Sequence, residues 1–131
     1  VILCDEDAAP GGRLLAEPQM INGLSAEHWR AATLAALHGL PDVTIMPRTT
    51  VYGVFDQGTY GAVERVSDHL AEPPPFAVRQ RGWRIHARRT ILAAGALERP
   101  IVFPGNDRPG VMLASAARHF PASTRVTRWR W

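Results

Sequence analysis

The chain opens on four apolar residues, Val1–Cys4, that run directly into the acids Asp5, Glu6 and Asp7. The run is short and contains two β-branched residues, which is typical of a buried strand. Because a buried strand has neighbours on both sides, this opening limits the chain to folds with a central sheet. The acids then lie where that strand ends.

The pattern downstream of the acids predicts a mixed fold. Ser25 is a good N-terminal cap for a helix, and Gly39 with Pro41 would stop that helix at about His38. A strand–helix–strand start implies a parallel pair joined by a crossover. The later apolar runs alternate with turn residues and predict an antiparallel meander, followed by one strand that is apolar throughout. The expected strands are 43–55 interrupted at Pro47, 59–66, 83–87 and 90–94, with a Pro-rich surface loop at 68–81 and a helix at 111–120.

Composition narrows the class of protein. The chain has 131 residues, of which 46% are hydrophobic, as in a single globular domain. No apolar run reaches the length of a membrane span, and no signal segment opens the chain, so we expect a soluble, non-exported, cytoplasmic protein. The cationic residues are all arginine and are mostly dispersed. We therefore expect neither lysine-based catalysis nor nucleic-acid binding.

Metal and thiol chemistry are not expected either. Cys4 is the single cysteine, and its place in the apolar run indicates a buried structural thiol. The five histidines have no metal-ligand spacing such as HExxH. We predict no metal site and no catalytic residue in this chain.

Asp5 has the position of a nucleotide-binding acid. In dinucleotide-binding folds, an acid at the end of the second strand hydrogen-bonds the hydroxyls of the adenosine ribose. A short carboxylate suits this task because one acceptor group meets two neighbouring hydroxyl donors. It also disfavours a ribose phosphate, so NAD is expected rather than NADP. An ordinary turn acid has the same appearance, and no GxGxxG precedes this one.

Two small-residue turns fit the same interpretation. Gly11–Gly12 would let the backbone approach a cofactor closely, although a simple Pro-Gly-Gly turn explains it too. The triplet Ala93-Ala94-Gly95 ends the apolar run 90–94 as many flavin and nicotinamide proteins end a strand beside their cofactor. Small residues are needed there because a larger side chain would clash with the ligand.

Taken together, long stretches of the chain resemble one family. VILCDED…GGRLL, PRTTVYGVFDQGTYGAVERVSDHL and AAGALERPIVFPGNDRPGVMLASAAR are similar to the alpha subunit of heterotetrameric sarcosine oxidase, over about residues 1–118. Alpha subunits of related amino-acid and opine dehydrogenases that depend on FAD or NAD(P) share parts of this pattern and stay open as alternatives. A non-catalytic module that docks a partner subunit is an alternative of another class.

The resemblance implies a fold and a function. It implies an α/β, Rossmann-like FAD/NAD(P)-binding domain that is incomplete here, since its first strand and Gly-rich turn are missing. NAD would bind in this domain, and FAD, FMN and folate elsewhere in a hetero-oligomeric flavoprotein complex that demethylates sarcosine to glycine. FAD in this half-site is a further option. Amine oxidation would occur in another subunit, so this segment would be inactive alone.

The resemblance also implies the cofactor-binding positions. Asp5 and Glu6 match the ribose-binding acids, and Arg13 has a planar fork suited to a phosphate or ribose. The full set of implied positions is Asp5, Glu6, Gly12, Arg13, Thr50, Val51, Ala94 and Gly95. We expect residues 1–120 to form the partial NAD-binding domain, and 121–131 to be an irregular tail. A truncated or frame-shifted reading frame would explain both ends.

Overall fold

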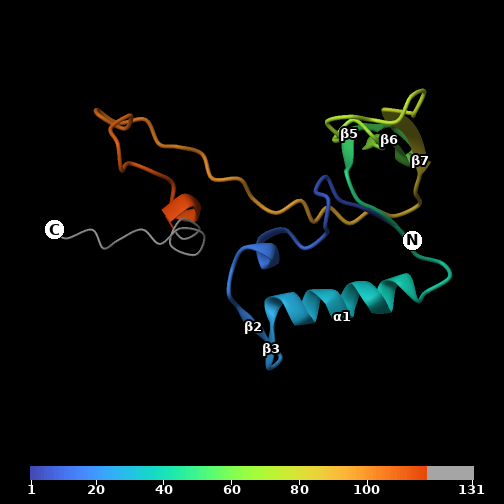
Figure 1. Ribbon diagram of the computed structural model, residues 1–131, viewed down its shortest axis with the longest axis horizontal. Coiled ribbons are helices and arrows are strands. Elements are labelled where there is room, and N and C mark those ends of the chain that lie inside the picture. The colour runs from blue at the N-terminus through green and yellow to red at the C-terminus, as the bar shows by residue number, and fades with distance from the viewer. Residues whose placement is uncertain (118–131) are drawn as a thin grey trace.

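A parallel strand pair and an antiparallel three-stranded sheet form the two sheets that flank the candidate site. The structure is a computed structural model that describes residues 1–117. Strands β1 (Ile2–Cys4) and β4 (Thr44–Met46) pair in parallel, with Ile2 opposite Thr44 and Cys4 opposite Met46. Helix α1 (Ala26–His38) lies between them in the chain (Figure 1). The parallel pair expected from the strand–helix–strand start is therefore confirmed, and the fold is mixed α/β.

Helix α1 begins and ends where its sequence predicts. The Ser25 hydroxyl accepts the N–H of His28, which satisfies one of the free amides of the first turn, and Gly39 ends the helix. A short hairpin of β2 (Met20–Ile21) and β3 (Leu24–Ser25) leads into it, after a 3-10 turn η1 (Gly12–Leu15). The helix buries its larger side chains only in part. Trp29, Thr33 and Leu37 are half-buried, whereas Ala32, Ala36 and Leu40 are exposed.

The predicted meander is confirmed. Its strands are β5 (Thr49–Phe55), β6 (Thr59–Arg65) and β7 (Gln80–His86), in the spatial order β5-β6-β7. The 3-10 turn η2 (Asp56–Gly58) joins the first two strands. A bulge between Val51 and Gly53 shifts the register of β5 against β6. The N–H of Ala87 donates to the carbonyl of Gly58 at 2.9 Å, so the end of β7 is tied to the η2 turn.

The described residues bury little apolar surface. Ala26 and Ala62 are the buried apolar side chains of residues 1–117, and the Val1–Cys4 strand, which the sequence predicts to be buried, is largely open. Ile2 is 49% and Leu3 38% exposed, because β4 is the one strand that pairs with β1 within this part of the chain. Cys4 is half-buried, and burial raises the pKa of its thiol.

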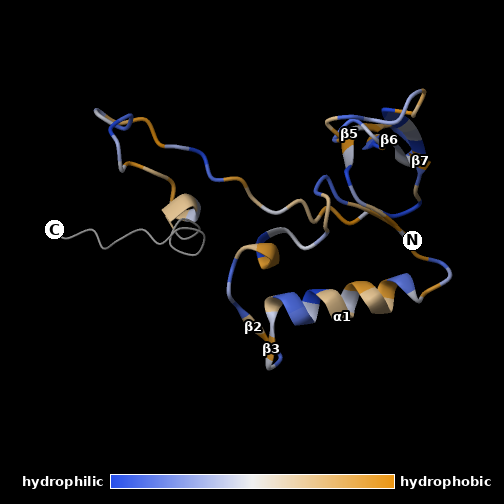
Figure 2. Cartoon of the chain, viewed as in Figure 1, coloured by the Kyte–Doolittle hydropathy of each residue, from blue (hydrophilic) through white to orange (hydrophobic). Residues whose placement is uncertain are grey.

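The expectation of a buried strand at residues 90–94 is wrong for this structure. These residues lie in no strand, and the side chains of Ile91 and Leu92 are 91% and 90% exposed. Beyond β7 the chain runs as an open trace toward a helical turn at 114–117 (Figure 1), although several of its residues are strongly apolar (Figure 2). A strand forms only where a neighbour completes its hydrogen bonds, and residues 1–117 supply none here.

Parts of two sequence predictions lie outside the described residues. The helix expected at 111–120 is seen as the turn at 114–117, and its last three residues lie beyond the described range. The tail at 121–131 and the boundary at residue 120 lie beyond it as well. Within residues 1–117, no helix has the length and apolar character needed to cross a membrane.

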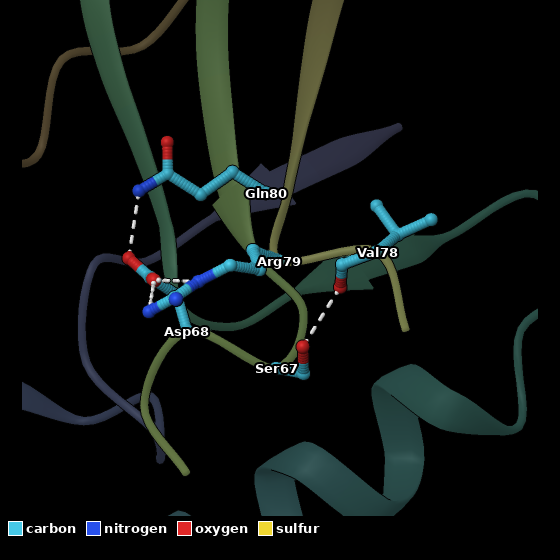
Figure 3. Close-up of polar contacts among 5 residues, drawn as sticks. All are labelled: Ser67, Asp68, Val78, Arg79 and Gln80. Carbon is cyan, nitrogen blue, oxygen red and sulfur yellow. Dashed lines mark hydrogen bonds and ion pairs between the residues drawn. The ribbon is translucent and has the colours of Figure 1, made fainter. Parts of the chain in front are cut away.

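Polar contacts close the loop between β6 and β7 at its base (Figure 3). The carboxylate of Asp68 accepts Arg79 Nε at 2.9 Å and Gln80 Nε2 at 2.7 Å, and Arg79 Nη2 forms an ion pair with it at 2.7 Å. Ser67 is buried, and its hydroxyl donates to the carbonyl of Val78 at 2.9 Å. The carbonyl of Arg79 also faces the N–H groups of residues 66–68 at 3.0, 3.1 and 3.2 Å. We call residues 66–68 with 78–80 the loop neck.

The stability that the loop neck contributes should depend on pH through Asp68. Hydrogen bonds from Gln80 and Arg79, aided by the Arg79 charge, hold the pKa of this carboxyl below its ordinary 3.8. Because the folded-state pKa is the lower one, Asp68 stabilises the fold at any pH above about 3.8, and this contribution is lost as the pH falls through the folded-state value. The urea midpoint of wild type should therefore approach that of Asp68→Asn in acid. If the urea midpoints of wild type and Asp68→Asn differ as much at about pH 3 as at neutral pH, this prediction is contradicted.

Candidate functional site

The acidic loop, residues 5–7, lies at the carboxyl end of β1 and against the start of β5. The N–H of Asp5 donates to Met46 O at 3.1 Å, and its carbonyl accepts the N–H of Thr49 at 2.8 Å. The N–H of Arg48 donates to the carbonyl of Asp7 at 2.8 Å. These bonds continue the β1–β4 pairing past Met46, so the acids keep a fixed place at the sheet end.

The Asp5 carboxylate is oriented by its own backbone. Its Oδ1 accepts the N–H of Asp7 at 2.9 Å, which is the local turn that aspartate favours. Within residues 1–117, its Oδ2 has no hydrogen-bond partner, and the side chain is half-buried. Arg65 Nη2 donates to the carbonyl of Glu6 at 2.6 Å and holds the middle of the loop. One carboxylate oxygen is therefore fixed, and the other is available to a ligand.

The Gly-Gly turn packs on helix α1. Gly11 has φ +143°, and a β-carbon there would lie 2.4 Å from Arg30 Cδ. Arg30 Nη1 donates to Pro10 O at 3.4 Å, whereas its Nε is buried and has no partner within the described residues. Gly12 has φ +51° and open space around it, and Arg13 is exposed. The turn can thus present open backbone and a cation, with Arg30 beneath it.

Of the eight predicted positions, Gly12 and Arg13 lie in the Gly-Gly turn, and the other six fall into two groups in the structure. Asp5 is bonded to Thr49, so Glu6, Thr50 and Val51 come close to it through the chain. Thr50 and Val51 are exposed, and they pair with Val63 and Ala62 of β6. Ala94 and Gly95 are exposed in the open trace, and within residues 1–117 no hydrogen bond joins them to the acidic loop. The structure thus brings the acids to β5 and shows no hydrogen bond between them and the Ala-Gly turn within residues 1–117.

Sequence reasoning missed two arginines that support these loops. Arg30 lies under Gly11, and Arg65 holds the Glu6 carbonyl. A signal for Arg30 exists in its place beside Trp29 on the half-buried side of α1, while Arg65 acts over 59 residues and has no local signal. A shallow depression lies by residues 15–20 and 25–27, but none of the eight predicted positions lines it. No three His, Cys, Asp or Glu side chains of residues 1–117 gather as metal ligands.

Comparison with known proteins gives a consistent result. The chain is 47% identical over 120 residues to the sarcosine oxidase alpha subunit of Rhizobium meliloti (strain 1021), covering 92% of this chain and 12% of that protein. It is 46% identical to the sarcosine oxidase alpha subunit of Corynebacterium sp. (strain P-1), covering 92% and 13%. An opine oxidase subunit of Agrobacterium tumefaciens (strain Ach5) is 28% identical, covering 90% and 23%. No family model matches the chain.

The chain therefore spans about an eighth of the length of the sarcosine oxidase subunits that it matches, at 12% and 13%. Because the likeness covers 92% of the chain, it includes the Ala94-Gly95 turn. It confirms the resemblance predicted from the sequence: this chain is homologous to one segment of the alpha subunits of sarcosine oxidase.

Proposed function

We propose that this chain forms the adenosine-ribose side of an NAD site in the alpha subunit of a sarcosine oxidase-type oxidoreductase. The observation that carries the proposal is the Asp5 carboxylate at the end of a parallel strand. Its Oδ1 is fixed by the Asp7 N–H at 2.9 Å, and Oδ2 is without a partner in residues 1–117. An acceptor in this place suits the two ribose hydroxyls.

The residues present fit the adenosine end of a dinucleotide. Gly12 keeps its backbone open for a close approach, and Arg13 beside it supplies a cation. The unpartnered Arg30 Nε beneath them gives this turn further unused donor capacity. A bound NAD supplies hydride chemistry at its nicotinamide ring, and the residues of this chain only hold and orient its other end. We propose no catalytic residue here.

The fold that we propose for the complete domain is Rossmann-like. A further parallel strand with its Gly-rich turn would pair with the open edge of β1 on one side and with residues 90–94 on the other. The observations in favour are that β1 pairs with β4 alone among residues 1–117, and that Ile91 and Leu92 are almost fully exposed. Such a strand would bring Ala94 and Gly95 to the acidic loop and complete the eight-residue set.

The proposed parent protein is a multi-subunit flavoenzyme of the bacterial cytoplasm. Its substrate would be sarcosine, its product glycine, and its other cofactors FAD, FMN and folate, all held outside this chain. The names of the relatives support the subunit organisation and the oxidase class. The opine oxidase relative, at 28% identity, keeps a related amine substrate open as the alternative. A docking module without cofactor is the alternative from another class.

Replacing Asp5 with asparagine in the full-length protein should weaken NAD binding at least about tenfold. Asparagine keeps the size but loses the charge, and its amide offers donors where the ribose needs an acceptor. Isothermal titration measures the affinity. Glu72→Gln is the matched control, since it removes one exposed carboxylate far along the chain and should leave NAD affinity unchanged.

The same titration separates the alternatives. Lost NAD binding with intact assembly of the complex supports the cofactor role, and lost assembly with no NAD binding in wild type supports the docking module. Flavin that co-purifies with the wild-type protein and is lost in Asp5→Asn would identify FAD in this half-site. We expect the isolated 131-residue chain to show no measurable NAD binding, and micromolar affinity there would contradict the view that the phosphate end lies outside it.

A further inference from the structure

Each carbonyl group of the acidic loop accepts a hydrogen bond from a donor outside the loop. The carbonyls of Asp5 and Asp7 accept the N–H groups of residues 48–49, each at 2.8 Å. Those two donors belong to the backbone at the start of β5. The carbonyl of Glu6, between them, is served by a side chain instead, since Arg65 Nη2 donates to it at 2.6 Å. The middle of the acidic loop therefore depends on one arginine.

The Glu6 carbonyl belongs to the same peptide unit as the N–H of Asp7. A peptide unit is planar, so a donor that fixes its oxygen also fixes the direction of its N–H. This N–H is the donor that holds Asp5 Oδ1 at 2.9 Å. A cation that donates to the carbonyl also polarises the peptide and strengthens the N–H as a donor. Arg65 thus acts on the Asp5 carboxylate through one intervening peptide.

Arg65 is itself held in place at the end of β6. Its backbone N–H donates to the carbonyl of Arg48 at 2.9 Å. Hydrogen bonds from Gln80 and Arg79 lower the pKa of Asp68 most, and the charge of Arg65 lowers it further. The guanidinium therefore lies near both the acidic loop and the loop neck. A donor that is already ordered gives up little conformational freedom to hold the acidic loop.

We propose that Arg65 is a positioning residue of the NAD site, which orients the Asp5 carboxylate toward the ribose through the Glu6–Asp7 peptide. This rests on the proposed function, because that function assigns the ribose to Asp5. The direction of the open Oδ2 of Asp5 follows from where Oδ1 is held. Without Arg65 the peptide can rotate, and the carboxylate then points at the ribose for only a fraction of the time.

The test is Arg65→Met in the full-length subunit, with NAD as the probe in isothermal titration. Methionine keeps an unbranched apolar stem and removes the donors. We expect the dissociation constant for NAD to rise at least about fivefold. The rise should be the same at about 0.05 M and about 0.5 M salt, because salt screens attraction between distant charges and not this hydrogen bond. A loss that disappears in high salt would contradict the inference.

Arg84→Met is the matched control. Arg84 is an exposed arginine of β7, and it lies on the same face of the sheet as Arg65, since they pair with Gly61 and Gln80 respectively. The control removes the same charge and leaves the bonds of the acidic loop in place. Its NAD affinity should match that of wild type. An equal loss in both variants would overturn the inference, because net charge would then be the cause.

A double-mutant cycle with Asp5→Ala tests the route through the carboxylate. If Arg65 acts on the ribose through Asp5, then Arg65→Met should weaken NAD binding by less than about twofold once that carboxylate is absent. Ligand-detected NMR measures these weak affinities. The same loss with and without Asp5 would show that Arg65 acts on NAD by another route, and the inference would be wrong.

The titration also separates positioning from a merely structural role. If Arg65→Met lowers the number of binding sites and leaves the affinity of each unchanged, Arg65 supports folding alone and the inference fails. If wild type binds NAD and Asp5→Asn weakens that binding while Arg65→Met does not, the inference fails and the proposed function stands. If the wild-type full-length subunit binds no NAD, the two fail together.

Discussion

Alanine in place of Gly58 is expected to lower the free energy of unfolding by about 3 kcal/mol. Gly58 has φ +67°, and a β-carbon there would lie 2.5 Å from the carbonyl oxygen of Ala87. This oxygen belongs to the backbone and cannot turn aside as the end of a side chain can. The Ala87 N–H to Gly58 O bond of 2.9 Å would also be strained or lost. Urea unfolding followed by circular dichroism measures the change.

Gly82→Ala is the control for this prediction. Gly82 lies in the middle of β7 in the same sheet, and a β-carbon there meets nothing within 4 Å. The change in its free energy of unfolding should stay within about 0.5 kcal/mol of wild type. If Gly58→Ala lowers the free energy of unfolding no more than Gly82→Ala does, the contact with Ala87 does not hold the η2 turn to the sheet.

Alanine in place of Gly11 is expected to lower the free energy of unfolding by about 2 kcal/mol. The new β-carbon would lie 2.4 Å from Arg30 Cδ, and φ +143° is a conformation that alanine resists. Arg30 would have to leave the turn and lose its bond to Pro10 O, which is 3.4 Å in wild type. Under the proposed function, NAD affinity of the full-length protein would fall too, since Gly12 and Arg13 follow directly.

Gly12→Ala provides the comparison on the same turn. Gly12 has φ +51°, but a β-carbon added there would meet no atom within 4 Å, so alanine has a conformational cost without a clash. We expect Gly12→Ala to lower the free energy of unfolding by about 1 kcal/mol. If both substitutions lower the free energy of unfolding equally, the Arg30 side chain can move away without loss of stability and does not support the turn.

The sequence predicted the elements whose formation depends on local signals. Ser25 caps α1 as expected, and the alternation around Pro47 places β4 and β5 correctly. The apolar run 90–94 failed as a strand prediction, because a strand depends on a partner and residues 1–117 offer none. Apolar character alone cannot report whether that partner is present.

In the candidate site, too, local sequence patterns predicted some features and missed others. The place of Asp5 at a strand end was predictable, because an acid after an apolar run is a local pattern. Its bond to Thr49 and the support of Glu6 by Arg65 were not, since both contacts join residues far apart in the chain.

The loop neck has a consequence for how this surface can change in evolution. Its bonds join residues 66–68 to 78–80 and use no atom of residues 69–77, which form the rest of the loop. Changes of length or sequence at the tip therefore leave the sheet register intact. The surface that residues 69–77 present can thus change while the acidic loop, anchored at the start of β5, keeps its place.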